Sequence, residues 1–360
     1  MYKKYIENLK SYEAGKPIEL IVREYGIEPK DVIKLASNEN PLGCSKRVSE
    51  AIAKSADRAY LYPDDSMFEL KEALSNRFGV DSKEIIIGAG SDQILEFISH
   101  IKLDEGSKIL TSNITFAMYE IYAKGFGAEV IKTDSYRHIA DEFIEKIESE
   151  NPDIVYICTP NNPTGDATRR DDIFKIIDAT PKESLVVVDC AYMEYVDSRD
   201  YFVEPKDFIK YSNVVYLGTF SKAYGLGGMR VGYGIANREL IDILYKVRPP
   251  FNITTLSLVA AIEASKDSDF VVRSVELNSK ELSRYEEFAK ESGIEYIPSW
   301  TNFITYLLGE NRDSTKIANN LMKKGIIVRD LSSYGLNAIR VTIGKEEQNS
   351  RLFKELKEEI

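Results

Sequence analysis

Lys222 is the residue of this sequence whose surroundings are best suited to chemistry. It follows an apolar run at 214–217 and lies in a glycine-rich segment, 218–234, that also holds Arg230. A lysine amine is a nucleophile only when it is deprotonated, and desolvation or a neighbouring cation favours that neutral form. Arg230 could supply the cation, while Thr219 and Ser221 could hold an anion beside the amine. Taken alone, the segment also fits an ordinary loop lysine among turn glycines.

A second segment is suited to hold a phosphate group. The apolar run 84–87 leads into Gly88-Ala-Gly-Ser-Asp-Gln93, and the spacing predicts a helix over 94–101. A glycine turn that opens a helix offers free N–H groups and the positive end of the helix dipole. The turn lacks the third glycine of G-x-G-x-x-G and the Gly-Lys-Ser/Thr of a P-loop. A helix capped by Ser91, without any ligand, therefore fits these residues as well as an unspecified phosphate site.

Asp189 ends the apolar run 184–189, so its carboxylate is expected to be partly buried and to need a cationic partner. A protonated pyridine nitrogen is one such partner. An aspartate at that nitrogen, a lysine that forms an imine and a phosphate cup are together what pyridoxal 5′-phosphate requires. Tyr192, and Asn162 after the apolar run 153–158, could reach the hydroxyl of the cofactor ring.

The elements that must position these residues alternate between strands and helices. Continuous apolar runs at 153–158 and 184–189 favour strands covered on both faces, as in a parallel sheet. Right-handed crossovers then place helices on both sides of the sheet. Ligands bind at the carboxyl ends of such strands. Four segments are expected to meet there: 88–92, 161–165, 189–192 and 219–222.

The predicted fold class is α/β, with a mostly parallel central sheet, helices on both faces and a smaller α+β domain. The smaller domain is indicated by a β-α-β-β-α pattern from 295 to the end of the chain. We expect an N-terminal arm at 1–40 that closes over the site, a large cofactor-binding domain at 41–255 and a small domain at 256–360. A chain of 360 residues is long enough for this division.

Composition excludes several classes of protein. The net charge is −11 without a basic run, which argues against a nucleic-acid surface. The three cysteines have no C-x-x-C spacing, and both histidines, His100 and His138, are predicted on surface helix or loop. A zinc site, a disulfide framework and a Ser-His-Asp hydrolase are therefore poorly supported. No apolar stretch is long enough to span a membrane, and the N-terminus has no apolar signal region, so we expect a cytoplasmic location.

The motifs in their order resemble those of the fold-type I pyridoxal-phosphate aminotransferases of class I and II, and more narrowly the histidinol-phosphate aminotransferases. The resemblance covers essentially the whole chain. The matching motifs lie at 11–17, 36–43, 62–65, 90–92, 161–165, 219–222 and 338–344.

The resemblance implies roles for the residues of the cofactor site. Lys222 would form the imine with the cofactor and later move a proton, while Asp189 would pair with the ring nitrogen. Asn162 and Tyr192 would contact the ring oxygen, and Phe116 would stack on the ring. The residues implied for the phosphate cup are Gly90, Ser91, Asp92, Thr219, Ser221 and Arg230. Tyr62 resembles a tyrosine that reaches the phosphate in the neighbouring subunit, which implies a homodimer.

Four further residues are implied for substrate binding. Arg340 and Arg329 lie on predicted strands of the small domain, and an arginine fork matches carboxylate and phosphate groups. Asn38 and Tyr12 would come from the N-terminal segment that closes over the site. A pair of surface strand arginines is the alternative interpretation of Arg329 and Arg340.

The implied reaction converts L-histidinol phosphate and 2-oxoglutarate into imidazole acetol phosphate and L-glutamate, in histidine biosynthesis. Two alternatives share nearly all of these positions: an aromatic aminotransferase and an aminotransferase for another phosphorylated amine. A decarboxylase of a phosphorylated amino acid such as threonine phosphate is a third alternative, which shares the fold. Transcription regulators with an aminotransferase-like domain add a DNA-binding module, for which this chain is not expected to have the N-terminal length.

Overall fold

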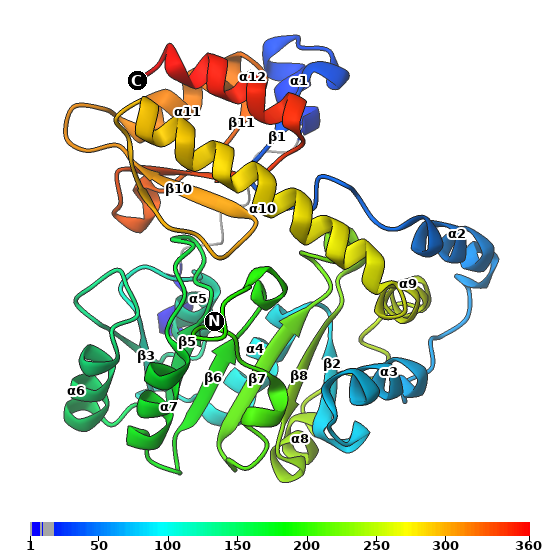
Figure 1. The fold of residues 1–360 in the computed structure, drawn as a ribbon. Coiled ribbons are helices and arrows are strands. Elements are labelled where there is room, and N and C mark those ends of the chain that lie inside the picture. The colour runs from blue at the N-terminus through cyan, green and yellow to red at the C-terminus, as the bar shows by residue number, and fades with distance from the viewer. Residues whose placement is uncertain (1, 8, 10–17) are drawn as a thin grey trace.

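A seven-stranded sheet forms the centre of the larger part of the molecule in the computed structural model, which describes residues 2–7, 9 and 18–360 (Figure 1). The strand order is β2-β8-β7-β6-β5-β3-β4. All neighbours are parallel except for the two pairs that involve β8. The mostly parallel sheet expected from the sequence is thereby confirmed. The strands are β2 (Ile85–Gly88), β3 (Lys108–Thr111), β4 (Glu129–Lys132), β5 (Ile154–Cys158), β6 (Leu185–Asp189), β7 (Val214–Thr219) and β8 (Gly232–Ala236).

Helices cover both faces of this sheet, each over its own hydrophobic cluster. One face packs against α4 (Ser91–Lys102), α5 (Met118–Gly125) and α8 (Arg238–Tyr245). The opposite face packs against α2 (Lys46–Ser55), α3 (Phe68–Phe78), α6 (Ala140–Glu150), α7 (Arg170–Ala179) and α9 (Thr255–Ser265). Every residue of β5, β6 and β7 is buried, as their continuous apolar sequences predict.

The smaller part contains a four-stranded antiparallel sheet in the order β12-β13-β10-β9. Its strands are β9 (Glu295–Ile297), β10 (Phe303–Leu307), β12 (Arg329–Asp330) and β13 (Ala338–Thr342). Helices α10 (Ser268–Glu291), α11 (Ser314–Lys323) and α12 (Glu346–Lys357) cover it. Segment 326–330 is divided between two sheets, because β11 (Ile326–Ile327) pairs with β1 (Ile33–Lys34), close to α1 (Ile18–Tyr25), while β12 pairs with β13.

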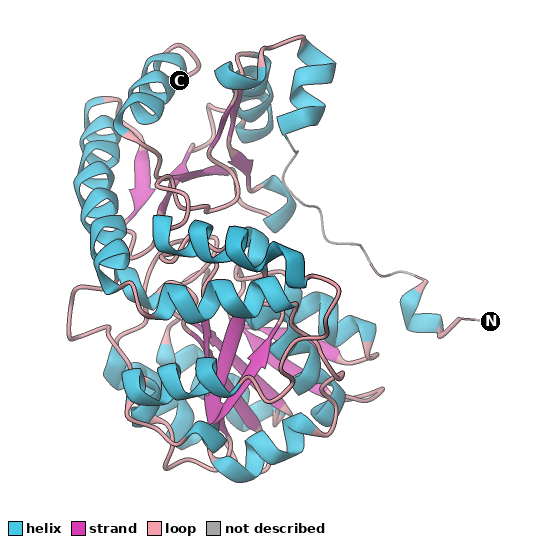
Figure 2. Cartoon of the chain, turned by 90° about the vertical axis from the view of Figure 1, so that its right-hand side faces the viewer, coloured by secondary structure: helices cyan, strands magenta, loops and turns pink. Residues whose placement is uncertain are grey.

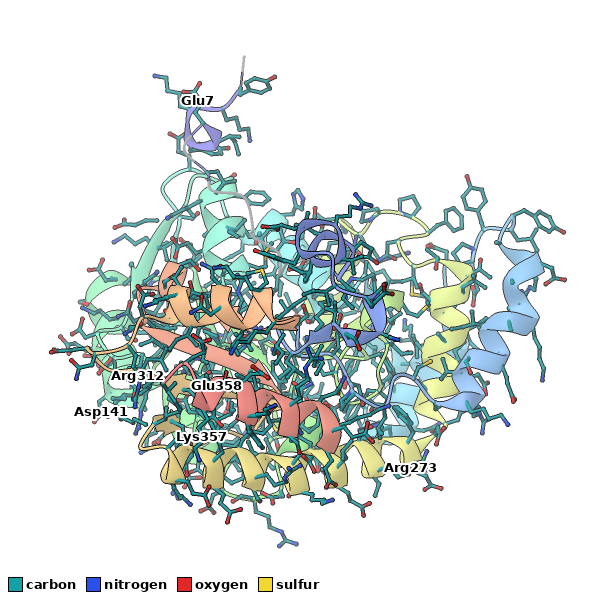
Figure 3. All side chains as sticks on the ribbon, turned by 90° about the horizontal axis from the view of Figure 1, so that it is seen from above. Glu7, Asp141, Arg273, Arg312, Lys357 and Glu358 are labelled. Atoms are coloured by element: carbon teal, nitrogen blue, oxygen red, sulfur yellow. The ribbon has the colours of Figure 1, made fainter. Side chains whose placement is uncertain are left out.

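Helix α10 runs from the larger part to the smaller one along the side of the molecule (Figure 2). Arg273 lies near its start, while Lys357 lies on α12 beside it, and Glu7 follows a short helix that lies apart from the main body (Figure 3). The division at 1–40, 41–255 and 256–360 stays a prediction; α9 and the first turns of α10 contribute side chains to the core beneath the large sheet.

The short 3-10 helices are Lys4–Ile6, Pro29–Asp31, Ala56–Arg58, Ser82–Glu84, Met193–Tyr195, Pro205–Asp207, Gly227–Met229 and Ser332–Tyr334.

Strand β8 lies in the segment whose glycines the sequence assigned to a turn-rich stretch. Glycines occur inside this strand because neighbouring parts of the chain approach its backbone so closely that a side chain would not fit. A Cβ atom at Gly232 would lie 2.1 Å from the backbone nitrogen of Ser91, and one at Gly218 would lie 2.2 Å from the ring of Tyr233. These glycines are therefore required by the packing between β7, β8 and the start of α4.

Two local predictions are corrected. Helix α4 begins at Ser91 itself, and its N-cap is Gly90, which has no side chain to form a capping hydrogen bond. His138 is buried rather than on the surface, because its Nε2 accepts a hydrogen bond from the backbone N–H of Cys158. Burial lowers the pKa of His138 to about 3. Within the part of the chain that the structure describes, no helix combines the length and apolar character needed to cross a membrane.

Candidate active site

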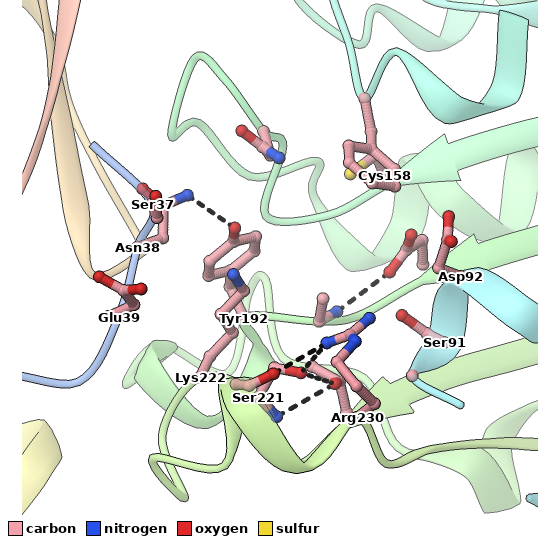
Figure 4. A pocket seen from close by; sticks show the side chains of 17 residues that line it. Ser37, Asn38, Glu39, Ser91, Asp92, Cys158, Tyr192, Ser221, Lys222 and Arg230 are labelled. Atoms are coloured by element: carbon pink, nitrogen blue, oxygen red, sulfur yellow. Dashed lines mark hydrogen bonds between the residues drawn. The ribbon is translucent and has the colours of Figure 1, made fainter. Parts of the chain in front are cut away.

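The carboxyl ends of the central strands open into a cavity of about 240 Å³ that is closed on one side by segment 37–39 (Figure 4). All four strand-end segments expected at this edge contribute to its lining. The lining residues are Ser37, Asn38, Glu39, Gly90, Ser91, Asp92, Phe116, Cys158, Asn162, Asp189, Ala191, Tyr192, Thr219, Ser221, Lys222, Gly227 and Arg230.

Lys222 follows the end of β7 and carries an amine suited to nucleophilic chemistry. Burial, followed by the positive charges of Arg340 and Arg230, lowers the pKa of this amine to about 8. Its Nζ lies 5.6 Å from the centre of the Tyr192 ring. A substantial fraction of the amine is therefore neutral near physiological pH, as a nucleophile or a proton acceptor requires.

A set of hydrogen-bond donors lies beside Lys222 and forms a cup for an anion. Ser221 Oγ accepts hydrogen bonds from Thr219 Oγ1 at 3.0 Å and from Arg230 Nη1 at 3.3 Å. Arg230 has a positive φ of 55°, an uncommon conformation for a residue other than glycine. A Cβ at Gly90 would lie 2.6 Å from Arg230 Nη2, so glycine makes room for the guanidinium.

Helix α4 completes the cup with its N-terminus, whose first-turn N–H groups favour a phosphate. The side chain of Asp92 does not suit this role, because a carboxylate repels a phosphate. Its Oδ2 accepts a hydrogen bond from Tyr122 OH at 3.1 Å, and burial raises the pKa of this carboxyl. The contribution of Asp92 to an anion site would therefore come from its backbone N–H.

Asp189 lies at the end of β6 and is 4% exposed. Its Oδ2 accepts a hydrogen bond from Tyr119 OH at 2.7 Å, and its Oδ1 accepts one from the backbone N–H of Ala191 at 3.2 Å. No arginine or lysine of the described residues forms an ion pair with it. A buried carboxylate in this situation fits a cationic ligand such as a pyridinium nitrogen.

Arg340 of β13 lies next to the cavity and contacts Asn162, which lines it. Its Nη1 donates a hydrogen bond to Asn162 Oδ1, and its Nη2 donates one to the backbone oxygen of Ala36 at 2.7 Å. Arg329 of β12 is directly opposite Arg340 in the antiparallel pair. Opposed residues project from the same face of a sheet, so both arginines face the same way.

Asn38 joins the two parts of the molecule at the cavity. Its backbone N–H donates to Thr342 Oγ1 at 2.9 Å, and its Nδ2 donates to Tyr192 OH at 2.8 Å. Asn38 itself has a positive φ of 56°. The segment is thus held between β13 and the turn after β6.

Among the described residues, three of the predicted site residues are not part of the cavity lining: Tyr62, Arg329 and Arg340. Tyr62 is 81% exposed on the surface, and its ring lies 4.7 Å from that of Phe251. Arg329 lies beside Arg340 but outside the lining. Tyr12 falls outside the described residues.

The fold also brings to the site residues that the sequence pattern did not single out. Glu39 and Cys158 line the cavity, and Tyr119 binds the carboxylate of Asp189. The position of Tyr119 had a usable signal, because a residue three positions after Phe116 falls on the same side of a helical turn. Nothing in the spacing of Cys158 distinguishes it from an ordinary buried strand residue.

Comparison with known proteins identifies the family. Residues 30–356 match the family model for aminotransferase class I and II. The histidinol-phosphate aminotransferase of Sulfurovum sp. (strain NBC37-1) is 61% identical over 100% of this chain and 99% of its own length. That of Sulfurimonas denitrificans is 60% identical over 98% of each chain.

Solved structures agree in fold. The crystal structure of histidinol-phosphate aminotransferase from Sinorhizobium meliloti in complex with pyridoxal 5′-phosphate has a TM-score of 0.90 and 26% identity, covering 99% of this chain and 96% of that one. A Thermus thermophilus aspartate aminotransferase double mutant has a TM-score of 0.84 at 18% identity, with 100% of both chains covered, and supports the fold alone. The chain is therefore a member of the class I and II aminotransferase family, with its fold-type I architecture.

Proposed function

We propose that this chain transfers an amino group between L-histidinol phosphate and 2-oxoglutarate, giving imidazole acetol phosphate and L-glutamate in histidine biosynthesis. The observation that carries the proposal is the buried Lys222 amine, with its lowered pKa, in one cavity with Asp189 and an anion cup. The choice of substrate is supported by the full-length relatives that bear this enzyme's name.

The residues of the cavity fit pyridoxal 5′-phosphate. Thr219, Ser221, Arg230 and the start of α4 would hold the phosphate, and Asp189 would face the ring nitrogen. Phe116 would lie against the ring, while Asn162 and Tyr192 would contact its oxygen. When bound, the cofactor supplies an aldehyde carbon that receives the amino group and a ring that withdraws electrons from the substrate.

Lys222 has two tasks in this proposal. Its neutral amine would hold the cofactor at the aldehyde carbon, and once the substrate has freed it, the same amine would accept the proton from the substrate Cα and return it on the cofactor side. Both tasks require a deprotonated amine, which burial and the two nearby arginines favour.

The substrate anion would be bound from the small-domain side. Arg340 would exchange its hydrogen bond to Asn162 for a bidentate contact with the phosphate of histidinol phosphate or a carboxylate of glutamate. Arg329, on the same face of the sheet, would add a second positive charge. Asn38 would hold its segment over the cavity and exclude water, and Tyr12 would contribute from the N-terminal segment.

We also infer that the chain works as a homodimer. Tyr60, Tyr62, Phe68 and Phe251 form an exposed aromatic patch at the surface beside α3, and such patches mark interaction sites. Tyr62 does not reach the cavity of its own chain, which suits a tyrosine that contacts the cofactor phosphate of a partner. Light scattering after size exclusion should give twice the mass of one chain, and Tyr62→Ala together with Phe251→Asp should give a monomer.

A cytoplasmic location is part of the same proposal. Cys44, Cys158 and Cys190 are all free thiols, which suits a reducing compartment. Cell fractionation should find the protein with cytoplasmic markers.

The substrate assignment is tested by the visible absorption of the protein with bound cofactor. Addition of L-histidinol phosphate without a keto acid should convert the band of the aldehyde-derived cofactor to that of its amine form, and 2-oxoglutarate should reverse the change. A protein that ignores histidinol phosphate but responds to an aromatic amino acid would overturn the substrate. Release of carbon dioxide without a keto acid would indicate the decarboxylase instead.

A further inference from the structure

Tyr119 is a fully buried residue of α5 whose hydroxyl is directed at the carboxylate of Asp189. The hydroxyl donates a hydrogen bond to Oδ2 at 2.7 Å. Burial raises the pKa of Tyr119 well above its ordinary value, so the hydroxyl stays protonated and acts only as a donor toward this carboxylate. The other carboxylate oxygen has the backbone N–H of Ala191.

The ring of Tyr119 is fixed from two sides. It stacks on Tyr156 of β5, with ring centres 4.4 Å apart and an angle of 8° between the planes. Phe116, which lines the cavity, meets the same ring edge to face at 5.6 Å. The hydroxyl is therefore held by a rigid aromatic stack, and the hydrogen bond holds the Asp189 carboxylate in one orientation.

The electrostatic effect of this contact has a definite sign. Burial raises the pKa of Asp189, and the hydrogen bond from Tyr119 opposes that rise. Without the hydroxyl, the carboxylate would be more basic and would compete for the proton of any cationic nitrogen beside it. With the hydroxyl, the proton stays on the nitrogen.

We propose that Tyr119 is a positioning residue, whose hydroxyl keeps the Asp189 carboxylate oriented and ionised so that the cofactor's ring nitrogen retains its proton. This inference rests on the proposed function, in which Asp189 faces that nitrogen. Tyr119 touches neither the substrate nor the reacting atoms in this proposal and acts through Asp189.

The matched variants are Tyr119→Phe and Tyr156→Phe. Each removes one buried hydroxyl from the same aromatic stack, but only the hydroxyl of Tyr119 bonds to Asp189. Titration of the cofactor-free proteins with pyridoxal 5′-phosphate should show roughly ten- to a hundredfold weaker binding for Tyr119→Phe, the range for a hydrogen bond to a charged group. Tyr156→Phe should bind like the parent.

A spectroscopic measurement separates this role from simple support of the fold. Nitrogen NMR of protein loaded with cofactor labelled at the ring nitrogen should show a protonated nitrogen in the parent and in Tyr156→Phe. The signal of Tyr119→Phe should move toward the unprotonated form. Tyr119→His, which restores an aromatic N–H donor, should recover part of both the affinity and the signal.

A double-mutant cycle decides whether Tyr119 acts through Asp189. In an Asp189→Asn background, Tyr119→Phe should have less than a threefold effect on cofactor affinity. An equal loss in both backgrounds, or an unchanged nitrogen signal in Tyr119→Phe, overturns the proposal for Tyr119. Failure of the parent protein to bind pyridoxal 5′-phosphate would overturn the proposed function instead.

Discussion

The cofactor half and the substrate half of the cavity are built in different ways. In the phosphate cup of the cofactor half, the hydrogen bonds join residues close in sequence: Thr219 and Arg230 contact Ser221 across separations of 2 and 9 residues. In the substrate half, Asn38 bonds to Tyr192 and Thr342 across separations of 154 and 304 residues. The first set depends on local turns at strand ends, and the second depends on how the small domain sits on the large one. A substitution in one half should therefore weaken cofactor binding or substrate binding, but not both.

The largest effect is expected for Lys222→Ala, which removes the amine that both halves of the reaction use. Amino-group transfer should fall by roughly 10⁴-fold, the upper range for a positioned acid–base group. Lys206→Ala, at an exposed lysine, is the matched control and should keep the parent's rate. Initial rates of glutamate formation measure both, and a Lys222→Ala protein with near-parent activity would contradict the site.

Asp189→Asn is expected to damage the cofactor half alone. The amide keeps the shape of the side chain but loses the charge that would pair with the ring nitrogen. Loss of one partner from a buried ion pair weakens cofactor affinity by roughly 10³-fold. Equilibrium titration with pyridoxal 5′-phosphate measures the loss. Comparable affinities for variant and parent would show that the carboxylate does not meet the cofactor.

Arg340→Ala is expected to damage mainly the substrate half. The KM values for L-histidinol phosphate and 2-oxoglutarate should each rise roughly 30- to 100-fold, since a buried guanidinium that binds an anion is lost. Arg340→Lys should be intermediate, because lysine keeps the charge without the planar fork. If Arg340→Ala turned over both substrates as the parent does, the assignment of this strand to substrate binding would be wrong.

The pH dependence of cofactor capture tests how the two halves meet at Lys222. Only the neutral amine attacks the cofactor, so the capture rate should rise with pH and level off above the amine pKa of about 8. Arg340 lowers this pKa, after burial as the main cause, so Arg340→Ala should move the midpoint to higher pH. Stopped-flow absorbance of cofactor-free protein measures the rate. A midpoint unchanged by Arg340→Ala would show that the small domain does not influence the amine.

The smallest effect is expected for Thr342→Val, which removes the hydroxyl that accepts the backbone hydrogen bond of Asn38. One such hydrogen bond contributes about 1 kcal/mol, so the KM for substrate should rise roughly fivefold. Cofactor affinity should stay at the parent value. Substrate KM and cofactor affinity should both be measured for this variant. An equal loss of substrate binding and cofactor binding would mean that the two halves of the cavity are not separable.

The predictability of each site residue depended on whether its contacts are local in the sequence. The strand-end segments around Asp189 and Lys222 were placed correctly, because continuous apolar runs identify buried parallel strands and their carboxyl ends share one edge. Tyr119 was not found, although its hydroxyl bonds to Asp189 across 70 residues. A helix pattern indicates that a tyrosine is buried, but not which strand end its hydroxyl reaches.

Strand β8 shows the limit of propensity in the fold itself. Gly232 and Gly234 argue against a strand when only local preferences are considered. A strand nevertheless forms there and pairs with β7. Glycine is needed at position 232 because a side chain would clash with the backbone at Ser91. Whether a glycine-containing segment forms a strand therefore depends on the elements that pack against it, and not on local preference alone.

The amino-acid sequence by itself determined the fold class, the alternation of buried strands and helices and the local chemistry around Lys222, since these depend on periodicity and near neighbours. Only the tertiary structure decided that Arg340 reaches Asn162, that Tyr62 lies away from its own cavity and that Tyr119 holds Asp189. The physical reason is that such contacts arise from the docking of helices and domains, whose geometry is set by packing across the whole molecule rather than by any local run of residues.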